Sequence, residues 1–80
     1  MRNLHRLLNL NEHLEVWRIP SGEICVAYEN CEISDGVALI GMFGTGWTFE
    51  EAVDDYFEKI SGKKLVFNSC TDRRKEVRVL

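Results

Sequence analysis

The fold is decided by the stretch GTGWTFEEA at residues 44–52, where a glycine-broken strand ends and an amphipathic helix begins. Thr48 is a favourable N-cap residue, and Glu51 follows it at the spacing of a capping box. Beyond this cap, apolar residues recur at helical spacing and predict a helix over residues 49–61. The apolar face of the helix is formed by Phe49, Ala52, Val53, Tyr56, Phe57 and Ile60.

Three strands are predicted upstream of this helix. Residues 14–19 and 23–28 contain β-branched and aromatic residues and flank a Pro-Ser-Gly turn, so they should form a hairpin. Residues 30–36 are polar and end in Ser-Asp-Gly, which indicates a second turn. Residues 37–43 are nearly all apolar, which predicts a central strand buried on both faces.

Two short strands are predicted after the helix, at residues 65–67 and 77–80, and they form a basic hairpin over residues 63–80. The element order β-β-β-α-β-β predicts an α+β fold with two layers, one antiparallel sheet and one main amphipathic helix. All 80 residues should belong to this single domain, and residues 1–12 form either a short helix or a flexible arm. With Phe57 in the core, Phe57→Ala should cost roughly 3–5 kcal/mol.

The cysteines and the distribution of apolar residues argue against a secreted, disulfide-bonded protein and against a membrane protein. The chain has three cysteines without C-x-x-C spacing, and no continuous apolar segment that would suit a signal peptide or a membrane helix. We therefore expect a cytoplasmic protein with free thiols and with Cys25 in its core. No cofactor or metal is predicted, because a zinc site would need His5 or His13 from a distant part of the chain.

The net charge of −3 conceals an uneven distribution along the chain. Residues 63–80 carry six basic and two acidic residues, whereas residues 1–62 carry four basic and eleven acidic residues. Such a separation of charge can steer a partner or a second copy of the chain. Two outcomes are open. The chain forms a homodimer, through its charged halves or through an edge strand near Leu80, or its basic hairpin folds back onto its own acidic helix face.

Two charged surfaces are candidate binding sites. The second face of the helix carries carboxylates at helical spacing, and it is either a solvated surface or a docking surface for a basic protein partner. A single helix cannot wrap a metal ion, which disfavours a metal site there. The basic hairpin could contact nucleic-acid phosphates, or pair with acidic groups of the same or a neighbouring molecule. The acidic face comprises Glu50, Glu51, Asp54, Asp55 and Glu58, and the basic residues are Arg73, Arg74, Lys75 and Arg78, with Lys63 and Lys64 nearby.

Catalytic chemistry has little support in this sequence, so we expect a protein that is not an enzyme. His5 and His13 are the two histidines, and neither has an identifiable nucleophile as a partner. Cys31 lies beside a turn, where a thiol can be reactive, but no base accompanies it. The glycines within residues 41–46 are followed by acidic residues and not by Lys-Ser/Thr, so they do not form a phosphate-binding loop.

The two tryptophans are more informative than the histidines. Trp47 directly precedes the N-cap, where a hydrophobic staple against Ala52 or Val53 is expected. An exposed indole, of either Trp17 or Trp47, would be the first candidate for a binding hot spot.

The pattern of three strands followed by Gly44-x-Gly46-x-Thr48-x-Glu50-Glu51-Ala52 resembles the partial RNase H-like β-β-β-α domain of HicB-type antitoxins. The resemblance covers residues 14–60 and implies a strand that leads through a glycine into a capped helix. HicB proteins usually carry a DNA-binding segment after this unit, for which the final 20 residues here leave no room, and no toxin partner is identifiable.

The segment from Thr48 to Phe67 also looks like small uncharacterised proteins of bacteriophages and prophages, which implies a source and not an activity. A double-stranded-RNA-binding domain shares the α-β-β-β-α order, but its final helix begins with lysines where this one begins with Glu50 and Glu51, so we reject that function. We predict a small non-enzymatic protein-binding module, an accessory or inhibitor protein of a mobile element. The alternative is a nucleic-acid-associated protein that uses the basic hairpin.

Overall fold

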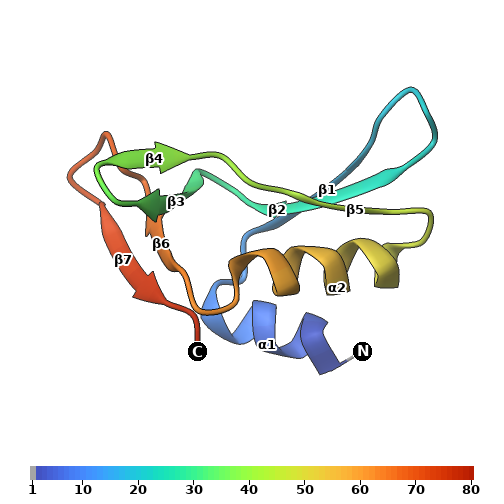
Figure 1. Cartoon of the computed structure of the whole chain (residues 1–80), viewed down its shortest axis with the longest axis horizontal. Coiled ribbons are helices and arrows are strands. Elements are labelled where there is room, and N and C mark those ends of the chain that lie inside the picture. Colours follow the sequence, from blue (N-terminus) through green and yellow to red (C-terminus); the bar gives the residue numbers. More distant parts are fainter. Residues whose placement is uncertain (1) are drawn as a thin grey trace.

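The computed structural model describes residues 2–80, and Met1 lies outside the described residues. Within that range two helices and seven strands form the fold (Figure 1). The predicted α+β class is confirmed, although the sequence predicts five strands and one main helix. The helices are α1 (Arg2–Leu10) and α2 (Phe49–Ile60). The strands are β1 (Leu14–Arg18), β2 (Ile24–Tyr28), β3 (Cys31–Asp35), β4 (Ala38–Ile40), β5 (Gly44–Gly46), β6 (Lys64–Phe67) and β7 (Lys75–Arg78).

The strands form two antiparallel sheets, where the sequence predicts one. The three-stranded sheet has the order β1-β2-β5, and the four-stranded sheet has the order β4-β3-β6-β7. Residues 24–46 run through both sheets, because β2 leads into β3 and β4 leads into β5. Asn30 lies at the step between β2 and β3 with a φ of 51°, in the left-handed region that Asn tolerates. This step redirects the chain from one sheet to the other.

Both predicted hairpins are present. β1 pairs with β2, with Val16 opposite Val26, and β6 pairs with β7, with Leu65 opposite Val77. The last strand begins two residues earlier than predicted, at Lys75.

The predicted strand at residues 37–43 is wrong in its bounds and in its burial. β4 covers three of these residues, lies at the edge of the four-stranded sheet and is exposed along its length. The polar segment before it, predicted as a turn, forms β3 between β4 and β6. β3 supplies the core with Ile33, while Glu32 and Ser34 face the opposite side of the sheet. The central strand β3 thus contributes one strongly apolar side chain, Ile33, to the core.

The predicted helix over residues 49–61 is confirmed as α2. Thr48 Oγ1 accepts the N–H of Glu51 at 3.2 Å, and the Glu51 carboxylate accepts the N–H of Thr48 at 3.0 Å. This capping box satisfies backbone donors that the first turn of a helix leaves unpaired. The helix start is thus fixed by local chemistry.

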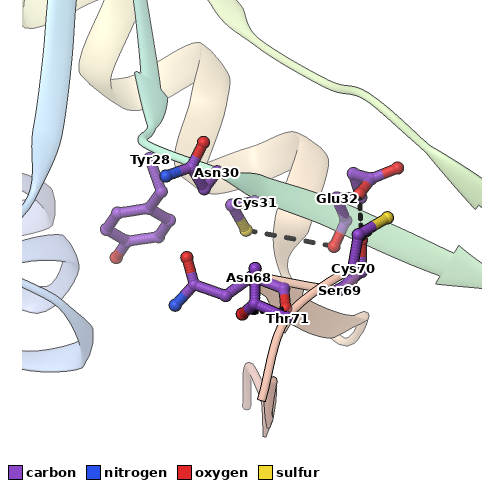
Figure 2. A pocket seen from close by; sticks show the side chains of 8 residues that line it. All are labelled: Tyr28, Asn30, Cys31, Glu32, Asn68, Ser69, Cys70 and Thr71. Carbon is purple, nitrogen blue, oxygen red and sulfur yellow. Dashed lines mark hydrogen bonds between the residues drawn. The ribbon is translucent and has the colours of Figure 1, made fainter. Parts of the chain in front are cut away.

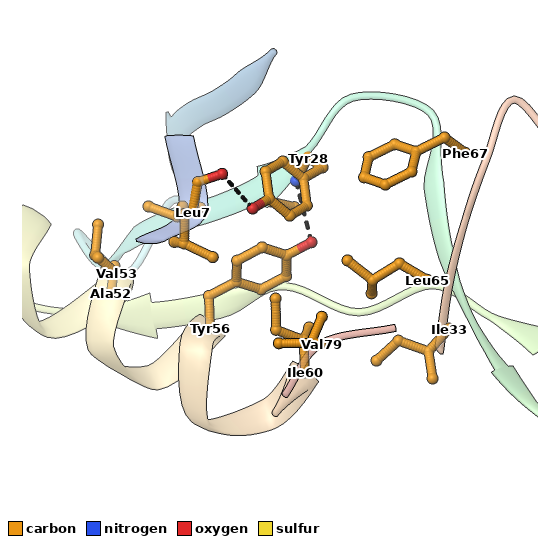
Figure 3. Packing of buried hydrophobic residues seen from close by; sticks show 12 residues of the cluster. Leu7, Tyr28, Ile33, Ala52, Val53, Tyr56, Ile60, Leu65, Phe67 and Val79 are labelled. Atoms are coloured by element: carbon orange, nitrogen blue, oxygen red, sulfur yellow. Dashed lines mark hydrogen bonds between the residues drawn. The ribbon is translucent and has the colours of Figure 1, made fainter. Parts of the chain in front are cut away.

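The core lies between α2 and the inner faces of the two sheets (Figure 3). The ring of Tyr56 packs edge-on against Tyr28, with centroids 5.6 Å apart, and its hydroxyl accepts the Tyr28 N–H at 3.1 Å. Phe57, predicted to be buried, is only half-buried beneath Arg6, whose guanidinium lies 5.5 Å from the ring centre. The buried cluster comprises Leu7, Val26, Ala27, Tyr28, Ile33, Ala52, Val53, Tyr56, Ile60, Leu65, Phe67 and Val79.

The N-terminal segment is helical, not a flexible arm. α1 packs along α2 (Figure 1) and buries Leu7 completely. The Tyr28 hydroxyl donates to the Leu7 carbonyl at 2.5 Å, and the Asn3 amide donates to Asp54 at 3.0 Å. These bonds tie α1 to the sheet and to the other helix.

Glycine allows β5 to lie directly against α2. A Cβ at Gly44 would overlap the carbonyl oxygen of Ala52 and the backbone of Tyr56. Since successive strand residues face opposite sides, Gly44 faces the helix while Phe43 and Thr45 face away from it. This orientation decides which side chains reach the outer surface.

Candidate functional site

The outer face of the three-stranded sheet carries two large aromatic side chains. Trp17 on β1 pairs with Cys25 on β2, which pairs with Thr45 on β5, so these residues share the face opposite α2. Phe43 also faces this side, because its neighbour Gly44 faces the helix. The rings of Trp17 and Phe43 lie 6.0 Å apart with planes tilted by 52°, and the two residues remain 39% and 47% exposed.

The central strand β2 carries two small residues, Cys25 and Ala27, at positions of the same parity as this face. Cys25 is fully buried although it faces away from α2, and Ala27 is nearly so. The predicted burial of Cys25 is confirmed, and the register places Trp17 beside it. The aromatic pair therefore lies on the outer face of the three-stranded sheet, with Trp17 in register with the buried Cys25.

Trp47 extends this surface to the end of the β1–β2 hairpin. It is 66% exposed, and its ring lies beside Gly22, where a Cβ would be 3.6 Å from Trp47 Cζ3. The predicted staple is wrong, because Ala52 and Val53 are buried in the core and Trp47 is not packed with them. We call the surface formed by Trp17, Phe43 and Trp47 the aromatic face.

The predicted acidic face of α2 is largely committed to contacts within the chain. Glu51 completes the helix cap, Asp54 accepts a hydrogen bond from α1, and Asp55 accepts one from β5. Among residues 2–80, Glu50 and Glu58 make no side-chain hydrogen bond or ion pair. The surface open to a basic partner is therefore smaller than the sequence indicates.

Asp55 and Lys59 cover the free edge of β5. Asp55 Oδ2 accepts the N–H of Thr45 at 2.8 Å and lies 2.9 Å from Lys59 Nζ, which donates to the Phe43 carbonyl at 3.2 Å. Burial raises the pKa of Asp55, but the hydrogen bonds from Lys59 and Thr45 outweigh burial and hold this pKa below its usual value. α2 thus satisfies backbone groups that an edge strand leaves open.

Asp55→Asn should lower the free energy of unfolding by about 1–2 kcal/mol near neutral pH, because the ion pair and a charged hydrogen bond are lost. Since the folded-state pKa is depressed, this contribution is complete above the unfolded-state pKa of about 3.9 and is lost as pH falls through the folded-state pKa. Urea unfolding across the acid range measures it, with Glu58→Gln as the control. Wild type and Asp55→Asn should converge in stability at the acid end, and a difference that stays constant with pH would contradict the charge contribution.

The basic residues of the C-terminal hairpin are partly paired with acid. Arg74 and Lys64 both contact Glu76, at 3.1 Å and 3.2 Å. Their hydrogen bonds hold the pKa of Glu76 below its usual value. Within residues 2–80, the bases of this hairpin without an ion pair are Lys63, Arg73, Lys75 and Arg78.

A cleft of about 420 Å³ lies between the β2–β3 step and the loop that follows β6 (Figure 2). Burial raises the pKa of the Cys31 thiol to about 12, so this thiol is protonated at neutral pH and is a poor nucleophile. Cys70 is exposed, and its neighbour Ser69 donates to the Glu32 carboxylate at 2.7 Å. Neither histidine lines the cleft, so no imidazole faces either thiol there, and the carboxylate that lines the cleft is that of Glu32.

No group of three or more His, Cys, Asp or Glu side chains within residues 2–80 is placed to hold a metal ion. Neither α1 nor α2 combines the length and the apolar character that crossing a bilayer requires.

No family model matches the chain, and it has no significant match among curated proteins or solved structures. The sequence indicated Trp17 and Trp47 as hot spots if exposed, but it placed Phe43 in a buried strand. Gly44 could have indicated that Phe43 is exposed. A glycine that faces the helix places its neighbour Phe43 on the opposite, outer face of the sheet.

Proposed function

We propose that this chain is a small non-enzymatic protein-binding module that contacts its partner through the aromatic face. The observation that carries this proposal is the Trp17–Phe43 pair, two partly exposed rings 6.0 Å apart on the outer face of the three-stranded sheet. Tryptophan and other aromatic residues are enriched at the centres of protein interfaces and dominate their energetics. A partner that covered these rings would remove apolar surface from water.

The charges on the same side of the sheet favour a protein over a nucleic acid. Glu15 lies in register with Ala27, and strand alternation places Glu15 and Glu23 on the face that carries Trp17. Carboxylates repel phosphate, and base-stacking surfaces normally lie in a positively charged groove. The unpaired bases Arg73 and Lys75 belong to the other sheet and its loop.

Three further expectations become parts of this proposal. Glu50 and Glu58 offer a small secondary contact for a basic segment of the partner. The resemblance to HicB-type antitoxins and to phage proteins favours an accessory or inhibitor role in a mobile element. Free cysteines agree with a reducing, cytoplasmic compartment.

The alternative function, nucleic-acid association, would use Arg73, Lys75 and Arg78.

Trp17→Ala and Trp47→Ala should each weaken partner binding by about 30-fold or more, the equivalent of the roughly 2 kcal/mol that defines a hot spot. Affinity capture from cell lysate, with and without nuclease, would provide the binder, and titration of the purified binder against each variant would measure the loss. Leu8→Ala removes an exposed apolar side chain on α1, away from the aromatic face, and should bind like wild type.

Two results would overturn this proposal. A binder that is unaffected by both tryptophan substitutions would place the contact elsewhere. If nuclease abolishes capture of the binder, and the double variant Arg73→Ala/Lys75→Ala also fails to capture it, the nucleic-acid alternative would be supported. Because Trp47 is largely exposed, Trp47→Ala should leave the urea unfolding curve unchanged, which separates a loss of binding from a loss of folding.

A further inference from the structure

Residues 38–46 form one free edge of both sheets, and the two halves of this edge differ. In the β5 half, Asp55 accepts the Thr45 N–H and Lys59 donates to the Phe43 carbonyl. In the β4 half, no side chain within residues 2–80 bonds to the outer backbone groups, and β4 pairs with β3 on one side only. Unpaired edge groups of this kind are a template for another strand.

The backbone groups of Leu39 point toward this open side. Asp35 and Ala38 close a two-residue turn, so their N–H and C=O groups face each other across the β3–β4 pair. This orientation alternates along a strand, so the groups of Leu39 point outward. Phe43 and Thr45 are separated from Leu39 by an even number of positions, so their backbone groups point to the same side. There Lys59 of α2 donates to the Phe43 carbonyl and Asp55 of α2 accepts the Thr45 N–H.

The β4 edge also differs from the other edges in its side chains. β1 has two charged residues among five, and β7 has three among four. Charged residues on edge strands oppose pairing with another chain. Residues 37–43 carry no charge, and Val37, Leu39 and Ile40 are all exposed. The β4 edge therefore has unpaired backbone groups and no charged side chain that would oppose pairing with another strand.

We propose that a second copy of the chain occupies the β4 edge and pairs antiparallel with it about a two-fold axis at Leu39. The two Leu39 residues exchange N–H···O=C bonds, and Ala38 of each copy lies opposite Ile40 of the other. The register is self-complementary, because it sets apolar side chains against one another and brings no like charges together. The two four-stranded sheets become one sheet of eight strands, independently of any contact at the aromatic face.

Sedimentation velocity over a wide concentration range tests this pairing. The mass should rise from 9.3 kDa towards twice that value, and the dimer should persist in about 1 M salt because exposed charges do not hold it. Leu39→Lys should abolish the dimer, since two ammonium groups would lie opposite each other. Val16→Lys makes the same kind of change at an exposed position of the β1 edge and should dimerise like wild type.

Amide hydrogen exchange of the wild-type chain gives a measurement that does not depend on a variant folding. Exchange at the Leu39 N–H should slow by about tenfold or more as concentration rises, while exchange at Ala38 and Ile40, which face β3, should change little. A monomer at every concentration, a dimer retained by Leu39→Lys, or a dimer lost equally in Val16→Lys would each overturn the proposal. Protection of Leu39 that required a foreign protein would assign the edge to a heterologous strand and would also overturn it.

Discussion

Gly44→Ala should prevent this domain from folding stably. The added methyl group would overlap the Ala52 carbonyl and the backbone of Tyr56, which cannot move away unless α2 leaves β5. Overpacking against backbone should cost at least about 3 kcal/mol, from a total of roughly 4–12 kcal/mol for a chain of this length. Urea unfolding followed by tryptophan fluorescence should show a midpoint lowered by about 2–3 M, or no cooperative transition.

Gly41→Ala is the matched control, because it adds the same methyl group in the same segment. Apart from its two chain neighbours, no residue of the described range 2–80 has an atom within 4 Å of a Cβ at Gly41, and the residue does not occupy the left-handed region. Its stability should therefore stay within about 0.5 kcal/mol of wild type, or rise slightly through a smaller unfolded-state entropy. A cooperative Gly44→Ala protein with a near wild-type midpoint would mean that α2 does not pack on β5.

Tyr56→Ala should cost about 3–5 kcal/mol, the second largest effect expected. The substitution removes a buried ring that packs edge-on against Tyr28, and it also removes the hydroxyl that accepts the Tyr28 N–H. Burial raises the pKa of this hydroxyl, so it remains neutral at physiological pH. Tyr56→Phe isolates the hydrogen bond and should cost about 1–3 kcal/mol, because the Tyr28 N–H would then be buried without a partner.

Phe57→Ala is the comparison that tests the rotation of α2 about its axis. Phe57 is half-buried beneath Arg6, so its loss should cost about 1–2 kcal/mol, less than the sequence-based expectation. Both variants should be measured by urea unfolding under the same conditions. A larger cost for Phe57→Ala than for Tyr56→Ala would show that the helix presents a different face to the sheets.

The aromatic face could be predicted only in part from the sequence. The sequence identifies Trp17 and Trp47 as hot-spot candidates only if they are exposed. Whether they are exposed depends on which side chains pack against them, which the sequence does not show. Phe43 could not be named, because an apolar run looks the same whether it is a central or an edge strand. Likewise, the spacing of the carboxylates in the sequence predicts that they share one face of α2. The structure shows that one of them, Asp55, accepts a hydrogen bond from Thr45 of β5.

The sequence by itself determined the features that depend on near neighbours. The start of α2 follows from Thr48 and Glu51, whose capping box closes within four residues, and the β1–β2 hairpin follows from strand residues around a turn. Only the tertiary structure decided which strand is central. β3 is polar but lies between two strands, whereas the apolar residues 38–40 lie at an edge. The burial of a strand is set by the strands hydrogen-bonded on either side of it, and β6, which flanks β3, is contributed by residues some thirty positions away.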